Sequence, residues 1–356
     1  MEQLQILFDA ERMKYPHTGL YHFCLNLGLA LQDLAPDNAS LTFFLNKQVE
    51  KPFQVGARYI PQHSHQKFLK PRFSQFDVWH STFQLTAYLP ADRRVKVLST
   101  IHDLNFLKEG KSEQKVARYL KKIQALIDRS DVVVAISNYV KSDIEHYCSL
   151  DGKTVHVIYN GNNINEQLLL DTEKNAPLVP EDYIYSIGTI NKKKNFHVLL
   201  YLLVGNNLKL VISGIVHEPE YLQKIQTLAA SLGVNDRVII TGPVSEADKY
   251  NYLANCSVFA FPSITEGFGL PVIEAMSFGK KVLLSKFTSL PEVGGEEAFY
   301  LESMDEEYLS DYGRNNLIKL IQTPTRVDEI KAWASQFSWE KAAAKYWRLY
   351  ATLSNR

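Results

Sequence analysis

Two glutamates bracket a glycine-rich stretch, E-G-F-G-L-P-V-I-E, which runs from Glu266 to Glu274. Carboxylates at this spacing can hold a metal ion, exchange protons, or accept hydrogen bonds from the hydroxyls of a ligand. Glycines at 267 and 269 allow the backbone to turn sharply and to approach a ligand closely. Pro271 suits the first position of a helix and Gly279 a position just past its end, so we expect a helix between them.

The start of this expected helix would attract an anion, because the N–H groups of residues 269–272 have no partner within the helix. Glu274 would then lie in the first helical turn, within reach of a diol beside the anion, and Glu266 would face the ligand from before the turn. A glutamate that only complements the helix dipole contributes roughly 0.3–1 kcal/mol. That explanation accounts for one glutamate, but not for the pair and its glycines.

A run of three lysines, Lys192, Lys193 and Lys194, lies between an expected strand and the apolar run F-H-V-L-L-Y-L-L. Such runs are usually solvated, and this remains the better interpretation of Lys192 and Lys193. Asn195 could cap the helix that follows. A lysine placed there can reach a bound phosphate and neutralise charge on a leaving group, so we favour a functional role for Lys194.

Two positions in the first half also follow expected strands. His102 comes directly after the strand 95–101, and both a structural and a catalytic role stay open for it. Gly19 precedes a helix and could either meet an anion or only ease the helix start. A dinucleotide site would need G-x-G-x-x-G there, so a nicotinamide enzyme is disfavoured. His63 and His65 lack a matching third ligand, so no metal site is predicted.

These positions are carried by alternating strand-like and helical segments. Strands are expected at 4–8, 41–45, 77–81, 95–101, 131–137, 154–159, 183–188, 208–214, 237–242, 257–263 and 280–285. Near-continuous apolar strands joined by helical crossovers predict parallel sheets covered on both faces, an α/β architecture. A polar segment with two prolines, 168–183, is the expected linker. We therefore expect two Rossmann-like, doubly wound domains that face a cleft and bind ligands beyond their carboxyl strand ends.

Bulk composition excludes some classes of function. The 356 residues include 39 basic and 39 acidic side chains, so no overall positive field attracts nucleic acid. Three scattered cysteines indicate reduced thiols, and neither a signal peptide nor a membrane-spanning run is apparent. A cytoplasmic protein is expected. The basic stretch 108–129 could contact anionic lipid on the inner face of the membrane, although a solvated helix face explains it more simply.

The stretch from Glu266 to Glu274 resembles the E-x7-E signature of retaining GT-B glycosyltransferases of family 4, also called glycosyl transferases group 1. Further segments are similar to family elements along nearly the whole chain: T-G-L-Y-H-F, T-I-H-D-L, A-I-S-N-Y-V, V-I-Y-N-G-N, I-G-T-I-N-K-K-K-N and S-L-P-E-V-G-G. The resemblance implies an acceptor-side domain of residues 1–170 and a nucleotide-sugar-binding domain of residues 171–337. It also implies that the closing helix, 338–356, packs back on the first domain.

The resemblance also implies roles for individual residues. Glu274 would bind the ribose hydroxyls, Glu266 the hydroxyls of the donor sugar, and Lys194 the diphosphate. Lys193 stands where relatives often carry an arginine that contacts the phosphate. His102 would lie against the sugar, Gly19 would cover the diphosphate, and backbone N–H groups of Phe268, Gly269 and Leu270 would complete the donor site.

The implied reaction is hexose transfer from a nucleotide diphosphate sugar to a glycan or lipid-linked acceptor, with retained configuration, in bacterial surface polysaccharide assembly such as lipopolysaccharide or capsule. GDP-mannose is the first expectation for the donor and a UDP-hexose the second. The sequence contains no Asp-x-Asp, so neither a metal nor another cofactor is predicted. A nucleotide-sugar epimerase on the same fold and an inactive binding subunit of a transferase complex are the alternatives.

Overall fold

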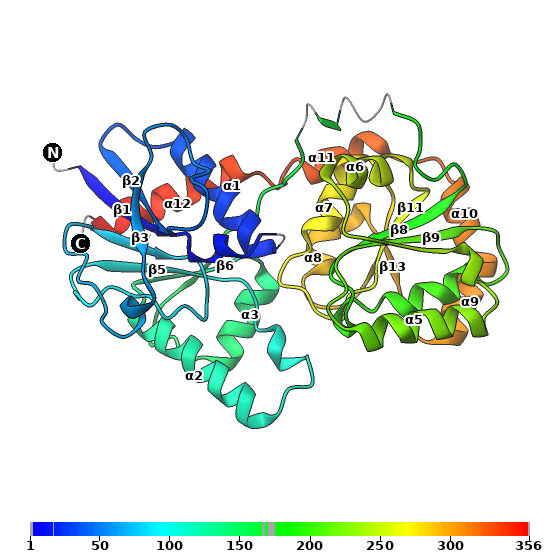
Figure 1. The fold of residues 1–356 in the computed structure, drawn as a ribbon, viewed down its shortest axis with the longest axis horizontal. Coiled ribbons are helices and arrows are strands. Elements are labelled where there is room, and N and C mark those ends of the chain that lie inside the picture. Colours follow the sequence, from blue (N-terminus) through cyan, green and yellow to red (C-terminus); the bar gives the residue numbers. More distant parts are fainter. Residues whose placement is uncertain (1–2, 17, 166–167, 170–174, 355–356) are drawn as a thin grey trace. The chain divides into compact units, whose positions relative to one another are not determined.

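The computed structural model describes residues 3–16, 18–165, 168–169 and 175–354. It divides the chain into two compact units (Figure 1). The N-terminal unit comprises Met1–Asn163 and Phe337–Arg356, and the C-terminal unit comprises Ile164–Gln336. The boundary expected between residues 170 and 171 lies outside the described residues.

The N-terminal unit is built on a parallel sheet, for which seven strands are described in the order β3-β2-β1-β4-β5-β6-β7. The strands are β1 (Leu4–Asp9), β2 (Ala39–Asn46), β3 (Arg58–Gln62), β4 (Val78–Ser81), β5 (Lys96–Ile101), β6 (Val132–Ala135) and β7 (Val155–Val157). The helices are α1 (Gly19–Asp33), α2 (Glu113–Arg129), α3 (Asn138–Tyr147) and α12 (Trp339–Ser354), with short 3-10 turns η1 (Glu11–Lys14), η2 (Ser64–Lys67) and η3 (Asn105–Leu107).

Helix α12 packs against α1 and over strands β1, β4 and β5. Its buried residues recur at three- and four-residue steps, which places them on one face of the helix: Trp339, Ala342, Ala343, Tyr346, Trp347, Tyr350 and Leu353. Polar contacts fix the register, because Tyr350 Oη lies 2.7 Å from His80 Nδ1 and Trp347 Nε1 donates to Leu31 O at 3.0 Å. The last helix of the chain thus completes the core of the first unit.

The C-terminal unit contains a second parallel sheet, with six described strands in the order β10-β9-β8-β11-β12-β13. The strands are β8 (Tyr183–Ile187), β9 (Lys209–Ser213), β10 (Val238–Gly242), β11 (Val258–Phe261), β12 (Val282–Ser285) and β13 (Phe299–Leu301). The α-helices are α5 (Pro219–Ser231), α6 (Glu246–Asn255), α7 (Leu270–Ser277), α8 (Leu290–Gly294), α9 (Glu306–Asn315), α10 (Leu317–Gln322) and α11 (Val327–Ala334). Four 3-10 segments are η4 (Lys192–Lys194), η5 (Phe196–Leu203), η6 (Asn235–Arg237) and η7 (Gly295–Glu297).

Each sheet reverses its strand order once, between β1 and β4 in the first unit and between β8 and β11 in the second. In an open parallel sheet the loops diverge at this point and leave a crevice beyond the carboxyl ends of the strands, where ligands bind. The expected α/β class with two Rossmann-like, doubly wound domains is therefore confirmed. Within the described ranges, we find no helix whose length and apolar character would let it traverse a membrane.

Candidate functional site

The strand order of the C-terminal unit brings the lysine loop and the glycine-rich turn together. Strand β8 pairs with β11, so the loop 188–195 and the loop 262–269 leave the same sheet edge side by side. A backbone hydrogen bond of 2.9 Å from Ile264 N to Lys193 O joins the two loops. Two loops whose residues Lys194 and Glu266 lie 72 positions apart in the sequence therefore form one site at the point where the strand order reverses.

The lysine loop is shaped by two residues with positive φ. Gly188 has a φ of +153°, and a Cβ there would lie 3.0 Å from Lys194 Cε. Asn195 adopts the left-handed conformation, with a φ of +58°, and its side chain makes no capping hydrogen bond. The cap expected at Asn195 is therefore not formed, and the capping side chain in this loop is that of Asn191, which accepts from Lys194 N at 3.2 Å at the start of η4. This short turn directs the last of the three lysines along the sheet edge.

Lys194 and Glu266 form an ion pair, with 2.5 Å between Nζ and Oε1. Each side chain is only 13% exposed, and the ammonium also lies 4.7 Å from the centre of the Phe261 ring. Burial opposes ionisation of Glu266, but the charges of Lys194 and Lys193 hold its pKa below the ordinary value. The carboxylate is thus kept ionised at the carboxyl end of β11.

The turn that follows is held by the loop after β12. Thr288 Oγ1 accepts from Glu266 N at 2.9 Å, and Ser289 Oγ donates to the carbonyl oxygens of Glu266 and Phe268 at 3.1 and 2.9 Å. The Phe268 side chain is buried, so the turn presents mainly its backbone. Gly269 has a φ of +112° and immediately precedes Leu270, the first residue of α7. The N-terminus of α7, which is the positive end of the helix dipole, therefore lies beside the Lys194–Glu266 pair.

Glu274 is the fifth residue of α7, beyond the first turn in which it was expected. It is buried and pairs with Lys249 of α6, with 3.4 Å between Oε2 and Nζ. Burial opposes the charge on Lys249, but Glu274 and Glu246 raise the pKa of its ammonium above the ordinary value. Lys249 could not be identified from the sequence, because it occupies an ordinary position in an amphipathic helix and belongs to no motif.

His102 lies at the carboxyl end of β5 in the N-terminal unit and is 7% exposed. Its Nε2 is 2.8 Å from Thr82 O, and because a carbonyl can only accept, this nitrogen carries the proton. Burial lowers the pKa of His102 to about 4, so the ring is neutral near pH 7. The ring also packs edge-on against Phe23, with 4.5 Å between the centroids.

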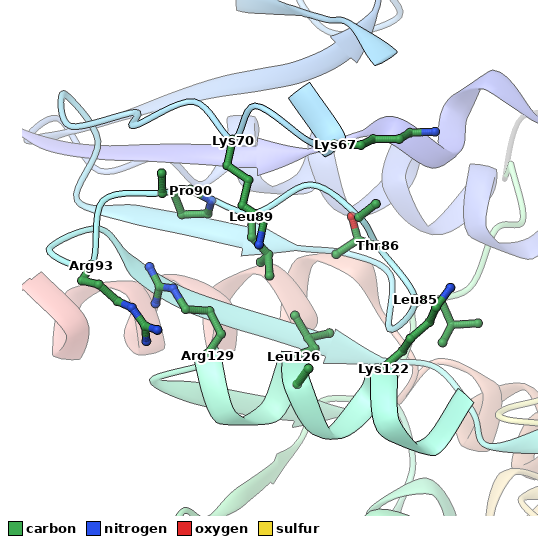
Figure 2. Close-up of a pocket in the computed structure, with 13 residues that line it drawn as sticks. Lys67, Lys70, Leu85, Thr86, Leu89, Pro90, Arg93, Lys122, Leu126 and Arg129 are labelled. Atoms are coloured by element: carbon green, nitrogen blue, oxygen red, sulfur yellow. The ribbon is translucent and has the colours of Figure 1, made fainter. Parts of the chain in front are cut away.

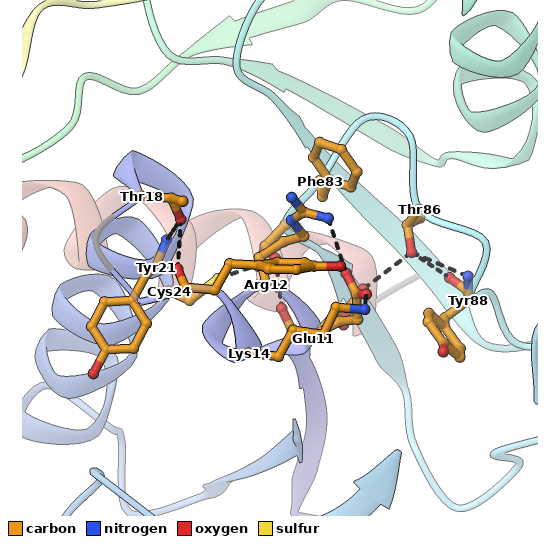
Figure 3. Close-up of polar contacts among 12 residues, drawn as sticks. Glu11, Arg12, Lys14, Thr18, Tyr21, Cys24, Phe83, Thr86 and Tyr88 are labelled. Atoms are coloured by element: carbon orange, nitrogen blue, oxygen red, sulfur yellow. Dashed lines mark hydrogen bonds and ion pairs between the residues drawn. The ribbon is translucent and has the colours of Figure 1, made fainter. Parts of the chain in front are cut away.

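A charged cluster that the sequence analysis did not identify surrounds the carboxyl end of β1. Asp9 is buried; burial, with Glu11 nearby, raises its pKa to about 8. Its carboxyl oxygens accept from Glu11 N at 3.0 Å and from Thr86 Oγ1 at 3.4 Å. Glu11 pairs in turn with Lys14 at 2.6 Å (Figure 3). The clue in the sequence was only that acids and bases alternate directly after a strand.

Gly19 opens α1 beside this cluster, and the Thr18 side chain caps the helix by accepting from Tyr21 N at 3.2 Å (Figure 3). A Cβ added at Gly19 would meet no atom within 4 Å. Packing within the unit therefore does not require glycine at this position. A requirement for glycine would have to come from a ligand.

The pattern of groups on the C-terminal unit suits one kind of ligand. A helix N-terminus and a lysine favour an anion, and two carboxylates, at the turn and on α7, can accept hydrogen bonds from hydroxyls. Among the described residues, no group of three or more histidine, cysteine or acidic side chains has a geometry that could hold a metal ion.

Comparison with known families assigns both units. Residues 171–314 match the family Glycosyl transferases group 1, and residues 43–166 match Glycosyltransferase Family 4. Together these matches cover most of each unit, and they include every expected site residue except Gly19.

The chain is similar to two mannosyltransferases of Escherichia coli. It is 30% identical over 244 residues to the serotype-specific mannosyltransferase WbdA, which covers 63% of this chain but only 29% of WbdA. It thus spans less than a third of that relative. It is 24% identical over 392 residues to the O-antigen chain mannosyltransferase B, covering 98% of this chain and 100% of that protein.

A solved structure shares the fold. The crystal structure of Anabaena Alr3699/HepE in complex with UDP and glucose superposes with a TM-score of 0.73 at 18% sequence identity. The match covers 98% of this chain and 100% of that one. The likeness extends over both units and identifies their fold as GT-B.

Proposed function

Because this chain belongs to the GT-B glycosyltransferases of group 1 and family 4, we propose that it transfers a hexose from a nucleotide diphosphate sugar to a glycan or lipid-linked acceptor. The reaction retains the anomeric configuration and serves bacterial surface polysaccharide biosynthesis. The observation that carries this proposal is the Lys194–Glu266 pair, which lies beside the N-terminus of α7 at the reversal of strand order. An anionic leaving group and a sugar require such neighbours.

Mannose from GDP-mannose is the proposed substrate, with a UDP-hexose as second choice. Two relatives with mannosyltransferase names support mannose, and one of them aligns over its full length. The second choice is supported by the fold neighbour that holds UDP and glucose. At 18% sequence identity, this neighbour is evidence for the fold of the chain and only secondary support for UDP as the nucleotide.

In the proposed mechanism, the Lys194–Glu266 pair separates when the donor binds. Lys194 moves its charge to the diphosphate, and the released Glu266 carboxylate accepts hydrogen bonds from the sugar hydroxyls. The acceptor oxygen bonds to C1 as the bond from C1 to the diphosphate oxygen breaks, and the acceptor proton passes to the departing phosphate. Negative charge grows on the diphosphate, where Lys194, Lys193 and the α7 N-terminus stabilise it.

The remaining residues position the donor. Glu274 holds the ribose hydroxyls, and the backbone N–H groups of Phe268, Gly269 and Leu270 contact the phosphate and sugar. Gly19 covers the diphosphate, because an absent side chain allows close approach. His102 meets the sugar as a neutral imidazole, which can accept a hydrogen bond through Nδ1 while Nε2–H is held by Thr82 O.

We further propose that the reaction needs no metal or other cofactor and takes place in the cytoplasm. Lys194 and the helix N-terminus already supply positive charge at the place where a metal would otherwise neutralise the diphosphate. Cys24, Cys148 and Cys256 are all free thiols, and two of them are buried, which supports a reducing compartment.

A transfer assay tests the proposal. The purified chain is incubated with GDP-mannose, UDP-glucose or UDP-galactose and an alkyl α-mannoside as acceptor. A glycosylated product from GDP-mannose is expected, and the one-bond C1–H1 coupling in NMR should match the configuration of the donor. An inverted linkage contradicts retention. An epimerised donor without transfer indicates an epimerase, and nucleotide binding with neither product indicates a binding subunit.

A further inference from the structure

A cavity of about 660 Å³ lies in the N-terminal unit between three segments. They are the chain that follows η2, the connection from β4 to β5, and the C-terminal half of α2. Figure 2 shows Leu126 and Arg129 rising from α2, while Lys70 extends toward them from the chain after η2. Neither the proposed donor site nor the family roles above account for this cavity.

The lining is strongly basic. Five cationic side chains contribute to it: Lys67, Lys70, Arg93, Lys122 and Arg129. The described lining residues include no aspartate or glutamate. Arg129 is fixed in place, because it donates to Val95 O at 2.8 Å and lies 3.8 Å from Asp131. Burial lowers the pKa of Arg129, and the nearby charge of Arg93 acts in the same direction, whereas Asp131 and Asp92 raise it. Arg129 is therefore partly balanced by acids outside the lining, and the positive charge open to an anion comes mainly from the other four basic side chains.

The rest of the lining is apolar. It consists of Leu85, Ala87, Leu89, Pro90, Ala91, Ala125 and Leu126, with Thr86 as the remaining polar residue. None of the described lining residues is aromatic. Bases of single-stranded nucleic acids stack mainly on aromatic side chains, which this lining lacks, and sugars commonly need polar acceptors, so the lining suits neither well. Basic side chains around an aliphatic floor suit a phosphate attached to an alkyl chain.

Two large apolar residues lie exposed at the rim. Phe68 is 87% exposed and Leu69 is 75% exposed, and they lie between Lys67 and Lys70, both of which line the cavity. Single exposed apolar side chains are common, but an adjacent phenylalanine and leucine flanked by lysines form a small amphipathic tip. At a membrane, such a tip places apolar side chains among the acyl chains and lysines among the phosphates.

We propose that this cavity binds the phosphate headgroup of an anionic phospholipid and that Phe68 and Leu69 enter the apolar layer of the same membrane. The proposed site differs from the basic stretch 108–129 that the sequence suggested as a lipid contact, because it uses only part of that stretch. From α2 only Lys122, Ala125, Leu126 and Arg129 line it, and the other lining residues come from 67–70 and 85–93. The proposal does not depend on the transfer reaction.

Vesicle flotation tests the proposal. The purified full chain is mixed with vesicles of phosphatidylcholine alone or with roughly one third phosphatidylglycerol. Binding is expected only to the anionic vesicles. Each basic residue near such a surface contributes about 1 kcal/mol, so the double variant Lys70→Gln, Lys122→Gln should bind roughly 20- to 30-fold more weakly. The double variant Phe68→Ser, Leu69→Ser should lose about tenfold or more.

Matched controls lie in the same unit and outside the cavity. Lys47→Gln, Lys51→Gln removes two exposed charges, and Val55→Ser removes a fully exposed apolar side chain. These variants should float as the wild type does, and all variants should keep its far-UV circular dichroism because the altered side chains are exposed. Equal loss of binding in the control pair would show a diffuse charge effect and overturn the site.

A soluble arm separates lipid from free phosphate. Inorganic diphosphate is titrated into the chain by calorimetry and is also added to the flotation assay. Because the proposed donor site also binds a diphosphate, it is first saturated with GDP. Under that condition the lipid proposal expects weak binding of inorganic diphosphate that Lys70→Gln, Lys122→Gln removes, together with strong binding of anionic vesicles. Diphosphate binding without vesicle binding overturns the lipid assignment, as does equal flotation with neutral vesicles.

Discussion

Each glutamate of the glycine-rich segment is paired with a different lysine. Glu266 meets Lys194 at the edge of the sheet, whereas Glu274 meets Lys249 between α6 and α7. Lys194 comes from the loop expected to bind phosphate and can exchange partners. Lys249 is 8% exposed and also contacts Glu246 at 3.0 Å, so we expect it to stay with Glu274 and orient the carboxylate.

The two glutamates should therefore fail differently when they are changed. Glu274→Gln removes a charge-assisted hydrogen bond to ribose worth about 1.5–3 kcal/mol, so binding of GDP should weaken by roughly ten- to 150-fold. Glu266→Gln should leave GDP affinity within a few-fold of the wild type. Turnover should nevertheless fall about a hundredfold or more, because the sugar is misplaced. Calorimetry with GDP and turnover assays measure both effects.

The glutamine variants are chosen because each glutamate is one half of a buried pair. Glutamine removes the charge but keeps the side-chain volume and an amide oxygen that can accept from the neighbouring lysine. Alanine would leave that lysine without an acceptor, at a cost of about 3–5 kcal/mol, and could unfold the chain. Loss of GDP affinity in both variants, or in neither, would contradict the division of ribose and sugar between them. A 2′-deoxy nucleotide should bind the wild type more weakly than GDP does. Only in Glu274→Gln should the two nucleotides bind with similar affinity.

A second expectation concerns Lys194 and metals. If the lysine neutralises the diphosphate, transfer should persist in excess EDTA. Lys194→Gln should then lower turnover by about 10²- to 10³-fold, the effect of removing one stabilising group for a developing charge. Lys192→Gln is the matched control from the same loop, and it should remain close to wild type. Complete loss of activity in EDTA that manganese restores would contradict the role given to Lys194.

The site residues could be predicted from local signals, but their pairing could not. Glycines, the Pro271 helix start and the lysine run mark two loops in the sequence. Lys194 meets Glu266 only because β8 and β11 are neighbours, and strand order depends on packing of the whole sheet. Lys249 and Asp9 carry no comparable local signal, since buried charges are recognised only once their surroundings are known.

Glycines stand at the starts of helices α7 and α1, and the structure shows different constraints on each of them. Gly269 has a φ of +112°, and a Cβ there would lie 2.9 Å from Leu290 Cδ2. Gly19 opens α1 with no atom within 4 Å of the same position. Backbone strain therefore requires glycine at 269, whereas only a ligand could require it at 19.

These two glycines give a matched pair of variants. Gly269→Ala should destabilise the chain by about 1–3 kcal/mol, because alanine disfavours that φ and meets Leu290. Gly19→Ala should leave stability within about 0.5 kcal/mol of wild type but weaken donor binding, since the new methyl group would face the diphosphate. Denaturant unfolding and calorimetry with GDP-mannose distinguish them. Unchanged donor affinity in Gly19→Ala would remove Gly19 from the donor site.

Regular elements with strong patterns were predictable, and short or irregular ones were not. The eleven expected strands all occur; Pro271 is the second residue of α7, one position later than expected, and Gly279 follows the C-cap residue Phe278. Two edge strands were missed: β3 contains Pro61 and β13 has three residues, so neither shows an alternating or continuous apolar run. The run after Asn195 forms a 3-10 helix, η5, whose eight residues are mostly buried. Hydrophobic periodicity alone does not distinguish that from a short α-helix.

At the scale of the whole chain, the C-terminal helix α12 belongs to the N-terminal unit. The apolar face of α12 was visible in the sequence, but its partner was expected only from the family resemblance, because any apolar sheet face could accept such a helix. The contacts of Tyr346 and Tyr350 with Thr100 and His80 supply the specificity. Each buried hydroxyl there finds a partner that a different docking site would not provide.

Buried titratable groups in the N-terminal unit should set its pH optimum of stability. Burial lowers the pKa of His80 to about 3 and of His102 to about 4, against an ordinary value of 6.5. As pH falls below 6.5, the unfolded chain binds these protons and the folded unit does not, so stability falls. Asp9 acts in the opposite sense. Its pKa is raised to about 8, so the folded unit keeps a proton that the unfolded chain loses above its ordinary value of 3.8.

Below pH 6.5 the two histidines outweigh Asp9, and between pH 6.5 and 8 Asp9 acts alone among these three groups. Stability should therefore peak near pH 6.5 and then fall by at most about 1.4 kcal/mol per pH unit. Asp9→Asn should flatten that fall, because asparagine does not titrate, whereas the exposed control Asp37→Asn should preserve it. Urea unfolding between pH 6.5 and 8 can be followed by fluorescence of Trp79, Trp339 and Trp347, which lie in this unit. Equal slopes in the two variants would mean that Asp9 does not hold its proton in the folded chain.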